Sequence, residues 1–445
     1  MRQITITVLL LITAFTVKAA GYDAVVAKDG SGTYKSVQAA IDAAPEGCTS
    51  PYKIYIKKGT YTEQITIPAS KPFLELIGEN VATTTIAYAD GKGGTTAFTI
   101  NANDCMLTGL TLENTQGRIG DGPQSLAVKT NADRIVFVNC RFISGQDTVM
   151  VAPANYRVYF YNCYIDGNTD FIYGASVAVF DKCVIYCRDR TDLSKGGYLT
   201  AASTPVNQPY GLVFRDCLLP GNHGITSYTL GRPWQNDAST EVKGRTRAGN
   251  KVVFLNTKMG ASIQPVGWSM WDAGTKTENI IYAEYHTQNT DGSLLDISKR
   301  VDWSKQLNVK DAAIYYDNKA VLGNWEPFAV WADLKQDRKQ SSLAVANFKV
   351  RFGTIDCFLQ FNSCWPQQGV TYTLLKSSDG VNYQEVKQLT SASNTDAAFE
   401  FTDQLPAEAQ TCYYQVKAAK GKETVLSEAI IVNLKDKPQG KTYTR

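Results

Sequence analysis

The chain has 445 residues, of which 44% are hydrophobic and 20% are charged, and its formal net charge is +3. This composition excludes a disordered chain and leaves room for more than one globular domain. The small charge does not fit a strongly basic nucleic-acid-binding protein, so we expect no nucleic-acid partner. Its two histidines, His223 and His286, argue against a histidine-rich metal centre and leave few candidates for a Ser-His-Asp triad. We expect both to be structural or surface residues.

The first 19 residues have the pattern of a secretory signal. Arg2 gives a basic start, an apolar stretch follows, and Val17, Lys18 and Ala19 fit a small-residue cleavage site. The apolar stretch is short for a membrane span. We therefore predict cleavage after Ala19, export to the periplasm or the medium, and no membrane partner afterwards.

A short pattern recurs along the middle of the chain. In each copy a phenylalanine stands three residues before a cysteine, a valine leads, and apolar or aromatic residues follow. Such β-branched and aromatic runs, bounded by Gly, Asn or Asp, predict strands. The copies are residues 136–142 (VFVNCRF), 158–165 (VYFYNCYI), 179–185 (VFDKCVI) and 213–219 (VFRDCLL), a fifth at 253–259 with Thr257 at the cysteine position, and a looser match at 110–115.

The spacing of this repeat favours a coil of parallel strands over a meander of hairpins. Cys140 to Cys163 is 23 residues and Cys163 to Cys183 is 20, which suits one turn of a parallel β-helix. Hairpins would bring turn signals about every 8–12 residues and would reverse alternate strands. In the coil the cysteines stack as small buried hydrophobic residues, and disulfide bridges are permitted but not required.

The repeat also places two aspartates side by side. Asp147 and Asp170 each follow the cysteine of their copy by seven residues, so they occupy equivalent positions on consecutive turns. Neighbouring strands lie about 4.8 Å apart, and carboxyl groups that close have their pKa values pushed apart. One then serves as an acid and the other as a base or nucleophile, with Arg190 on the next turn to offset the charge. Solvated aspartates at loop tips are the alternative, which Gln146 and the aromatic neighbours disfavour.

These residues and others resemble the pectin methylesterase (pectinesterase) family. One motif alone is weak evidence, but several in the family's order, with the independent count of the repeat, are specific. The resemblance covers roughly residues 22–330 and implies a right-handed parallel β-helix. The matching segments are residues 32–45 (GTYKSVQAAIDAAP), 55–63 (YIKKGTYTE), 124–128 (QSLAV), 145–148 (GQDT), 170–174 (DFIYG), 230–234 (LGRPW), 267–271 (GWSMW), 282–285 (YAEY) and 300–303 (RVDW).

The resemblance implies hydrolysis of the methyl esters of galacturonate in pectin, with neither metal nor cofactor. Asp170 would be the nucleophile, which splits one hard step into two. Asp147 would protonate the departing methanol and then activate water. Gln124 and Gln146 would line the oxyanion site as neutral donors, and Arg232 would orient Asp170 and hold it ionised.

The resemblance further implies that Trp234, Phe171 and Tyr173 contact the sugar. The chain departs from the family pattern at Tyr173, where phenylalanine is usual. It departs again at Val149 and Met150, which stand where an aromatic residue often follows. None of these departures removes a catalytic group.

Two other functions fit parts of the sequence. A polygalacturonase-like depolymerase also uses a parallel β-helix, and residues 168–170 (NTD) superficially match its motif. That family needs an adjacent Asp pair, a Gly-His-Gly and wider carboxylate spacing than adjacent turns provide. A non-catalytic, polyuronate-binding β-helix is the second alternative, although a polyanion binder would more plausibly use Arg and Lys than two carboxylates.

The last quarter of the chain predicts a second domain, which more loosely resembles a fibronectin type III β-sandwich. Short alternating strands are predicted at residues 346–352, 357–361, 372–376 and 413–418, with a hairpin signal at 377–383. This domain would bind carbohydrate or space the enzyme. We thus expect an all-β monomer with a signal peptide (1–19), a catalytic parallel β-helix (20–335), a polar linker (336–343), a sandwich (344–437) and a tail (438–445).

Overall fold

The computed structural model describes residues 21–118, 122–190, 195–224, 227–235, 249–331, 343–353, 355–404 and 411–433. The predicted signal peptide, the tail and most of the linker lie outside these ranges. Those assignments and the domain boundaries therefore stay predictions. Within the described ranges, no helix has the length and apolar character needed to cross a membrane.

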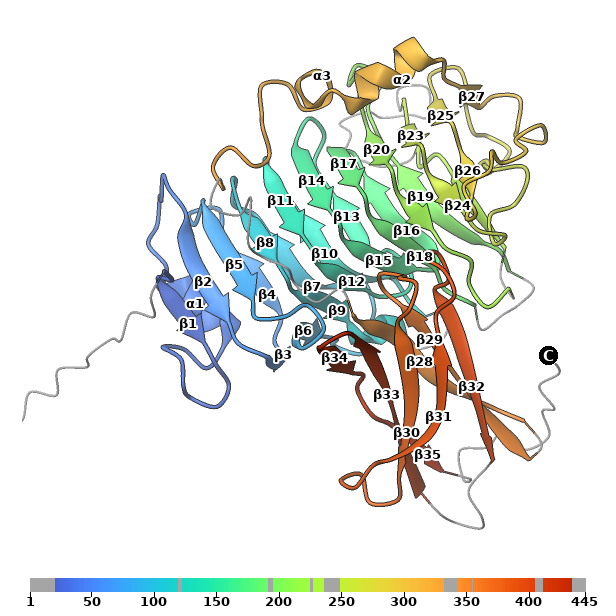
Figure 1. The fold of residues 1–445 in the computed structure, drawn as a ribbon. Helices are drawn as coiled ribbons and strands as arrows, with labels where there is room; N and C mark the ends of the chain where they lie inside the picture. Colours follow the sequence, from blue (N-terminus) through green and yellow to red (C-terminus); the bar gives the residue numbers. More distant parts are fainter. Residues whose placement is uncertain are drawn as a thin grey trace, which may run out of the picture.

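Three parallel sheets coil around one apolar core and form the β-helix that the repeat predicts (Figure 1). Neighbouring strands in each sheet come from successive turns of the chain. The 11-stranded sheet contains β1 (Ala24–Val26), β2 (Tyr52–Ile56), β5 (Leu74–Gly78), β8 (Met106–Thr108), β11 (Ile135–Val138), β14 (Arg157–Tyr161), β17 (Val177–Asp181), β20 (Leu212–Arg215), β23 (Lys251–Leu255), β25 (Ile281–Tyr285) and β27 (Lys305–Gln306).

The other two sheets complete each turn of the coil. The 9-stranded sheet contains β3 (Gly59–Thr62), β6 (Thr84–Tyr88), β9 (Thr111–Asn114), β12 (Arg141–Ile143), β15 (Tyr164–Gly167), β18 (Val184–Cys187), β21 (Leu218–Leu219), β24 (Lys258–Met259) and β26 (Gln288–Asn289). The 7-stranded sheet contains β4 (Ile65–Ile67), β7 (Thr95–Ile100), β10 (Ser125–Thr130), β13 (Val149–Val151), β16 (Thr169–Gly174), β19 (Gly197–Ala202) and β22 (Tyr228–Gly231).

The repeated phenylalanines form a continuous stack inside the coil. Phe137, Phe160, Phe180, Phe214 and Phe254 pair in register across consecutive turns. Their neighbouring ring centroids lie 4.8, 4.5, 4.5 and 4.4 Å apart. The cysteines of the repeat are buried in the same core, and all ten cysteines of the chain are unbridged. The predicted interior ladder is confirmed, and this stacking and apolar burial hold each turn on the next.

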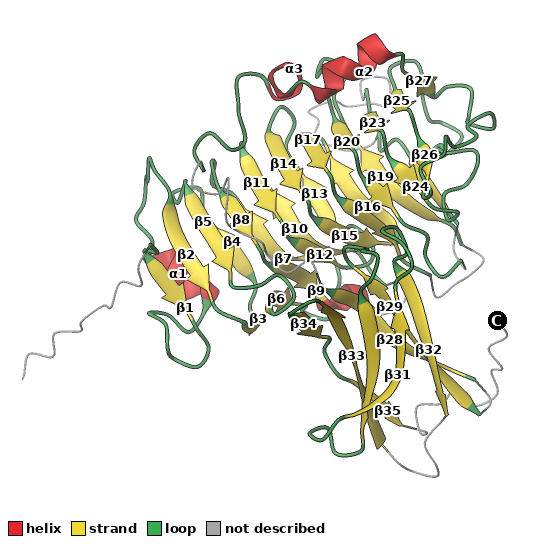
Figure 2. Cartoon of the chain, viewed as in Figure 1, coloured by secondary structure: helices red, strands yellow, loops and turns green. Residues whose placement is uncertain are grey.

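Short helices lie at the margins of the coil, which is otherwise built of strands and the loops that join them (Figure 2). The first is capped by Ser36, whose side chain accepts a hydrogen bond from the backbone N–H of Ala39, and it buries Val37 and Ile41 against the first turn. Val321 and Leu322 of a later helix pack on the outer face of the 11-stranded sheet. The helices are α1 (Val37–Ala43), η1 (Thr115–Arg118), α2 (Val309–Tyr316) and α3 (Asn318–Leu322).

The C-terminal strands form two antiparallel sheets, as expected of a small β-sandwich. Four of these strands match the sequence prediction to within two residues at each end. The likeness of this domain to a fibronectin type III domain stays a prediction. One sheet contains β28 (Val345–Phe352), β29 (Asp356–Ser363) and β32 (Ala398–Gln404); the other contains β30 (Thr371–Ser377), β31 (Gln384–Thr390), β33 (Thr411–Lys420), β34 (Glu423–Leu426) and β35 (Ile430–Asn433).

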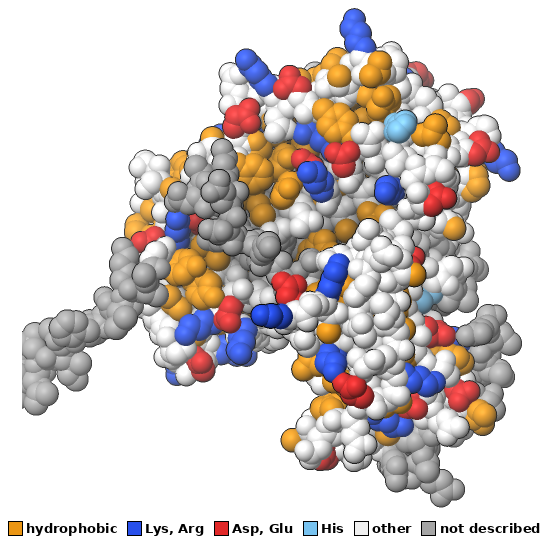
Figure 3. Space-filling view, viewed as in Figure 1, with side chains coloured by type: hydrophobic (Ala, Val, Ile, Leu, Met, Phe, Trp, Pro, Cys, Tyr) orange, Lys and Arg blue, Asp and Glu red, His pale blue; other side chains and the backbone are white. Residues whose placement is uncertain are grey.

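The sandwich packs against the side of the coil that the 9-stranded sheet forms (Figure 1). Tyr164 and Tyr186 of that sheet share a buried apolar cluster with Cys364 and Trp365 of the sandwich. On the visible face of the molecule, Lys and Arg side chains are interspersed with Asp and Glu (Figure 3). This distribution agrees with the small net charge.

We expect the aromatic stack to dominate the stability of the coil. Phe180 is fully buried between Phe160 and Phe214, so Phe180→Ala should lower the free energy of unfolding by about 3–5 kcal/mol. Val381→Ala, at a position that is 78% exposed, is the control and should change it by less than about 0.5 kcal/mol. Thermal unfolding of the variants measures both effects. Equal losses of stability in the two variants would contradict a dominant role of the stack in the stability of the coil.

Candidate active site

The 7-stranded sheet carries the two aspartates on adjacent turns, as the count of the repeat predicts. β13 and β16 pair in parallel, and Gln146, three residues before β13, bridges Thr169, the first residue of β16. The backbone N–H of Asp147 donates to the carbonyl oxygen of Thr169 at 3.0 Å. Asp147 and Asp170, the next residue after each half of that bridge, therefore lie side by side.

A bulge in the backbone turns Asp170 away from the core. The register of β16 against β19 shifts between Thr169 and Ile172, and φ is +48° at Asp170 and +65° at Asp147. A left-handed conformation outside glycine is costly, although aspartate tolerates it better than most residues. Phe171 is consequently fully buried inside the coil. Its predicted contact with the sugar is wrong, because its side chain does not reach the surface.

Arg232 directly follows β22, two turns after Asp170 in the coil, and binds the carboxylate of Asp170. Its Nε donates to Oδ1 at 2.9 Å and its Nη2 to Oδ2 at 2.6 Å. The guanidinium lies against the rings of Tyr198 and Trp271, 3.9 and 4.0 Å from their centroids. The two-pronged pairing fixes the orientation of the carboxylate, and the two rings fix the guanidinium.

The sequence had not assigned a role to either ring. Trp271 is the last residue of the GWSMW segment, which served only as evidence for the family resemblance. An aromatic residue in a motif of the family was the available signal for a role at the site. Tyr198 stands outside every recognised motif. Its contact with Arg232 depends on how β19 and β22 pair, and the pairing becomes visible only in the structure.

Burial and a neighbouring charge make Asp147 a much weaker acid than an ordinary aspartate. Burial, followed by the neighbouring charge of Asp170, raises the pKa of Asp147 to about 7, against lowering contributions from Gln146, Arg232 and Tyr173. Like charges at this separation favour protonation of one partner. Asp147 therefore keeps its proton to a much higher pH than an ordinary aspartate does.

Asp170 is the charged partner of the pair. Burial raises the pKa of its carboxyl group, and this rise is opposed first by the hydrogen bonds and charge of Arg232 and then by the charge of Arg190. Arg190, which the repeat placed on the next turn, also donates from Nη1 to Thr169 Oγ1 at 2.6 Å. Because Arg232 makes its ion pair with Asp170, the negative charge is favoured on Asp170 and the proton on Asp147.

A groove of about 440 Å³ lies over the pair. The rings of Tyr173 and Trp234 meet there with centroids 5.7 Å apart, in an apolar cluster that includes Met150. Lys129, which the sequence did not single out, also lines the groove. Seven of the eight predicted site residues are brought together in this lining, namely Gln124, Gln146, Asp147, Asp170, Tyr173, Arg232 and Trp234.

The polar groups of the groove divide into donors and acids. Gln124 and Gln146 bridge in parallel on neighbouring turns, so their amide side chains can offer N–H donors without adding charge. Asp147 and Asp170 supply one proton donor and one anion. Within the described ranges, no group of three or more His, Cys, Asp and Glu side chains is placed to hold a metal ion.

Comparison with known proteins gives consistent relatives. The Pectinesterase family model matches residues 23–324. Pectinesterase 4 of Arabidopsis thaliana is 34% identical over 300 residues, which are 63% of this chain and 47% of that protein. The chain thus spans about half the length of that curated relative.

Solved structures give the same likeness. A pectin methylesterase from carrot superposes with a TM-score of 0.61 at 26% identity, covering 68% of this chain and 94% of its own. A pectin methylesterase in complex with a hexasaccharide superposes with a TM-score of 0.57 at 29% identity, covering 69% of this chain and 99% of its own.

The raised pKa of Asp147 predicts a cost in stability at neutral and alkaline pH. The folded protein keeps this proton up to about pH 7, whereas the ordinary value is 3.8, so the free energy of unfolding falls as pH rises through that window. Asp147→Asn has no charge to bury. We expect it to be more stable than the wild type by about 2–4 kcal/mol at pH 8 and equally stable at pH 4.

Thermal unfolding at the two pH values measures this difference. Asp42→Asn, at an exposed helix position, is the control and should leave stability unchanged at both. A gain from Asp147→Asn that is the same at pH 4 and pH 8 would contradict the account.

Proposed function

The chain belongs to the pectinesterase family, and we propose that it hydrolyses the methyl esters of galacturonate residues in pectin, releasing methanol and leaving pectate. The observation that carries this proposal is the pair of buried aspartates on adjacent turns, of which one is clamped by Arg232 and the other is protonated near neutral pH. A nucleophile and an acid side by side are what acyl transfer to a carboxylate requires.

In the first step, Asp170 attacks the ester carbonyl carbon with one carboxylate oxygen. The amide groups of Gln124 and Gln146 donate to the oxyanion that develops. As the intermediate collapses, the carbon–methoxy bond breaks and Asp147 gives its proton to the leaving oxygen, so methanol departs. An acyl anhydride on Asp170 remains, and Asp147 is now ionised.

In the second step, water attacks the carbonyl carbon of the anhydride. Asp147 takes the proton of this water as a base, which restores its protonated state. The bond to Asp170 breaks and leaves its carboxylate free, and the carboxyl group of the sugar gives its remaining proton to the solvent as it leaves. Arg232 holds Asp170 in one orientation throughout, so the geometry for attack does not have to be found anew in each cycle.

The rest of the groove suits a uronate chain. Trp234 and Tyr173 form an apolar wall for a sugar ring. Lys129 lies one strand away, opposite Met150, where its ammonium can meet a free carboxylate of the polymer. The hexasaccharide in the solved relative supports a site that spans several sugar units.

A polygalacturonase-like depolymerase and a purely binding β-helix remain the alternatives to test. The adjacent aspartates leave little room for the water that an inverting glycosidase places between its carboxylates. A binding surface would not need one carboxyl group kept protonated. Because pectin is an extracellular polymer, we further propose that the chain acts after export, as a monomer, without cofactor or nucleic acid.

Methanol release from highly methylated pectin in the presence of EDTA tests the proposal. The wild type should release methanol, and Asp170→Ala should lower the rate by at least about 1,000-fold, because the nucleophile is lost. Asp42→Ala is the matched control and should keep full activity. No methanol from the folded wild type would overturn the esterase. New reducing ends in its place would point to a depolymerase, and silence in both assays to a binding protein.

A further inference from the structure

We infer that the C-terminal sandwich positions the catalytic turn, through a hydrogen bond from its Asn347 to the buried Asp166 of the β-helix. This makes Asn347 and Asp166 positioning residues and makes the sandwich a working part of the catalytic unit. The inference rests on the function proposed above. It differs from the two roles that the sequence predicted for this domain, carbohydrate binding and spacing.

Asp166 holds both ends of the turn that carries the proposed acid. It is fully buried near the end of β15. Its Oδ1 accepts from the backbone N–H of Ser144 at 3.3 Å, and its carbonyl oxygen accepts from Thr148 Oγ1 at 2.8 Å. Gln146 and Asp147 lie between these two anchor points, so a displacement of Asp166 is passed directly to them.

The sandwich in turn holds Asp166. Asn347 Nδ2, on β28, donates to Asp166 Oδ2 at 2.9 Å. The same oxygen accepts from the hydroxyl of Tyr164 at 3.1 Å, and Asn362 of β29 donates to that hydroxyl at 2.7 Å. Asn347 also donates to Asn362 at 2.7 Å, so the two sandwich residues act as one unit.

The backbone of β28 is bent to make this contact. The register of β28 against β29 shifts around Asn347, and φ there is +52°. A bulge and a left-handed residue interrupt an otherwise regular strand, and such devices redirect a side chain at an energetic cost. Here the redirected side chain leaves the sandwich and binds the β-helix.

A second link runs from the sandwich toward the nucleophile. Lys349 Nζ, also on β28, lies 3.9 Å from Asp189 Oδ2. The next residue, Arg190, donates to Thr169 Oγ1 at 2.6 Å, and its charge opposes the rise that burial causes in the pKa of Asp170. Both aspartates of the proposed pair are therefore connected to the same strand of the sandwich.

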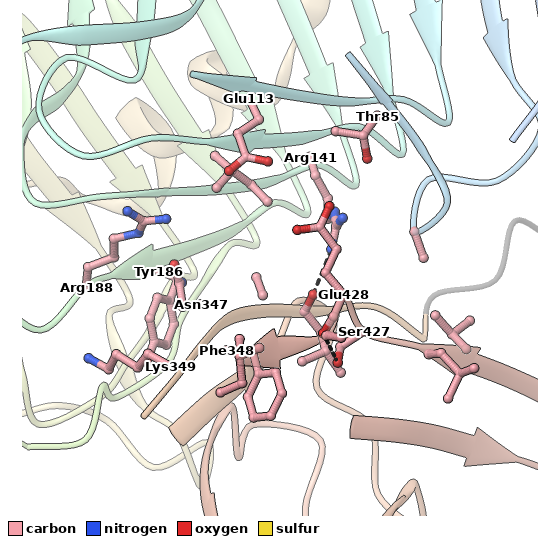
Figure 4. A pocket seen from close by; sticks show the side chains of 18 of the residues that line it. Thr85, Glu113, Arg141, Tyr186, Arg188, Asn347, Phe348, Lys349, Ser427 and Glu428 are labelled. Carbon is pink, nitrogen blue, oxygen red and sulfur yellow. Dashed lines mark hydrogen bonds between the residues drawn. The ribbon is translucent and has the colours of Figure 1, made fainter. Parts of the chain in front are cut away.

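Between these two links, the interface of the β-helix and the sandwich contains polar and charged side chains around a cavity. A cavity of about 340 Å³ lies between the two domains beside their direct contacts, and Arg188 and Tyr186 of the β-helix line it together with Asn347 and Lys349 (Figure 4). Arg188 Nε lies 3.2 Å from Asp166 Oδ1. A spacer needs no buried carboxylate at its contact. Buried polar groups must keep their hydrogen-bond partners, because leaving one of them unpaired is costly.

A pair of matched variants tests the inference. Asn347→Ala removes the bond to Asp166. Trp365→Phe removes another hydrogen bond across the same interface, from Trp365 Nε1 to the carbonyl oxygen of Asn162 at 3.3 Å, without touching Asp166. Methanol release is measured as kcat, KM and the pH profile of kcat/KM, and thermal unfolding reports the stability of each variant.

We expect Asn347→Ala to lower kcat about tenfold and to change KM less than twofold, because a displaced acid affects the chemical step. The alkaline limb of its pH profile should move to lower pH, since Asp147 is less closely confined beside Asp170. Trp365→Phe should keep the wild-type kcat and profile even where its melting temperature falls. Asn362→Ala, one bond further from Asp166, should move both readouts in the same direction by less.

Two results would overturn the inference. One is an Asn347→Ala enzyme with wild-type kcat and pH profile. The other is an equal loss of kcat in Asn347→Ala and Trp365→Phe, which would reduce the interface to general stability. If Asn347→Ala does not fold, Asn362→Ala decides by the same criteria. Failure of the folded wild type to release methanol would overturn the proposed function itself, so the two failures are distinguishable.

Discussion

The close approach of two carboxyl groups on neighbouring turns is the constraint on which the rest of the site depends. The spacing of hydrogen-bonded strands sets it at the level of the backbone, and the phenylalanine stack in the neighbouring 11-stranded sheet holds the same turns of the coil on one another. Two buried carboxylates so placed would repel each other. Arg232 resolves the conflict by pairing with Asp170 alone through two hydrogen bonds, which leaves the proton on Asp147. In the proposed mechanism, the roles of acid and nucleophile therefore depend on an arginine that lies two turns later in the coil.

Much of this arrangement could be read from the sequence, because a parallel coil repeats. The cysteine ladder gives the period, and the same period brings Asp147 and Asp170 together without knowledge of any relative. The roles of Gln124 and Arg232 came only from the family resemblance, since their distance in sequence carries no local signal. Phe171 was assigned wrongly because the bulge at Asp170 breaks the alternation of side chains along β16. Local sequence does not encode that bulge.

The sandwich shows a different limit of prediction. Strands β28, β29, β30 and β33 alternate apolar and polar residues, and this pattern predicts them from the sequence. β31 is almost entirely exposed and has the polar sequence QEVKQLT, so it lacks the signal of a buried face. The contact of Asn347 with Asp166 joins residues 181 positions apart. This contact depends on the left-handed backbone conformation in β28, which neither composition nor periodicity predicts.

The most direct test of the central claim is the protonation state of Asp147 itself. Carboxyl carbon resonances of protein labelled with ¹³C-aspartate can be titrated, with Asp147→Asn identifying the signal. We expect a midpoint near pH 7, because burial and the Asp170 charge raise the pKa of Asp147 to about 7, and a lower midpoint in Asp170→Asn, where that charge is gone. A wild-type midpoint at about 4, the value of an ordinary aspartate, would contradict the division of roles between the two carboxyl groups.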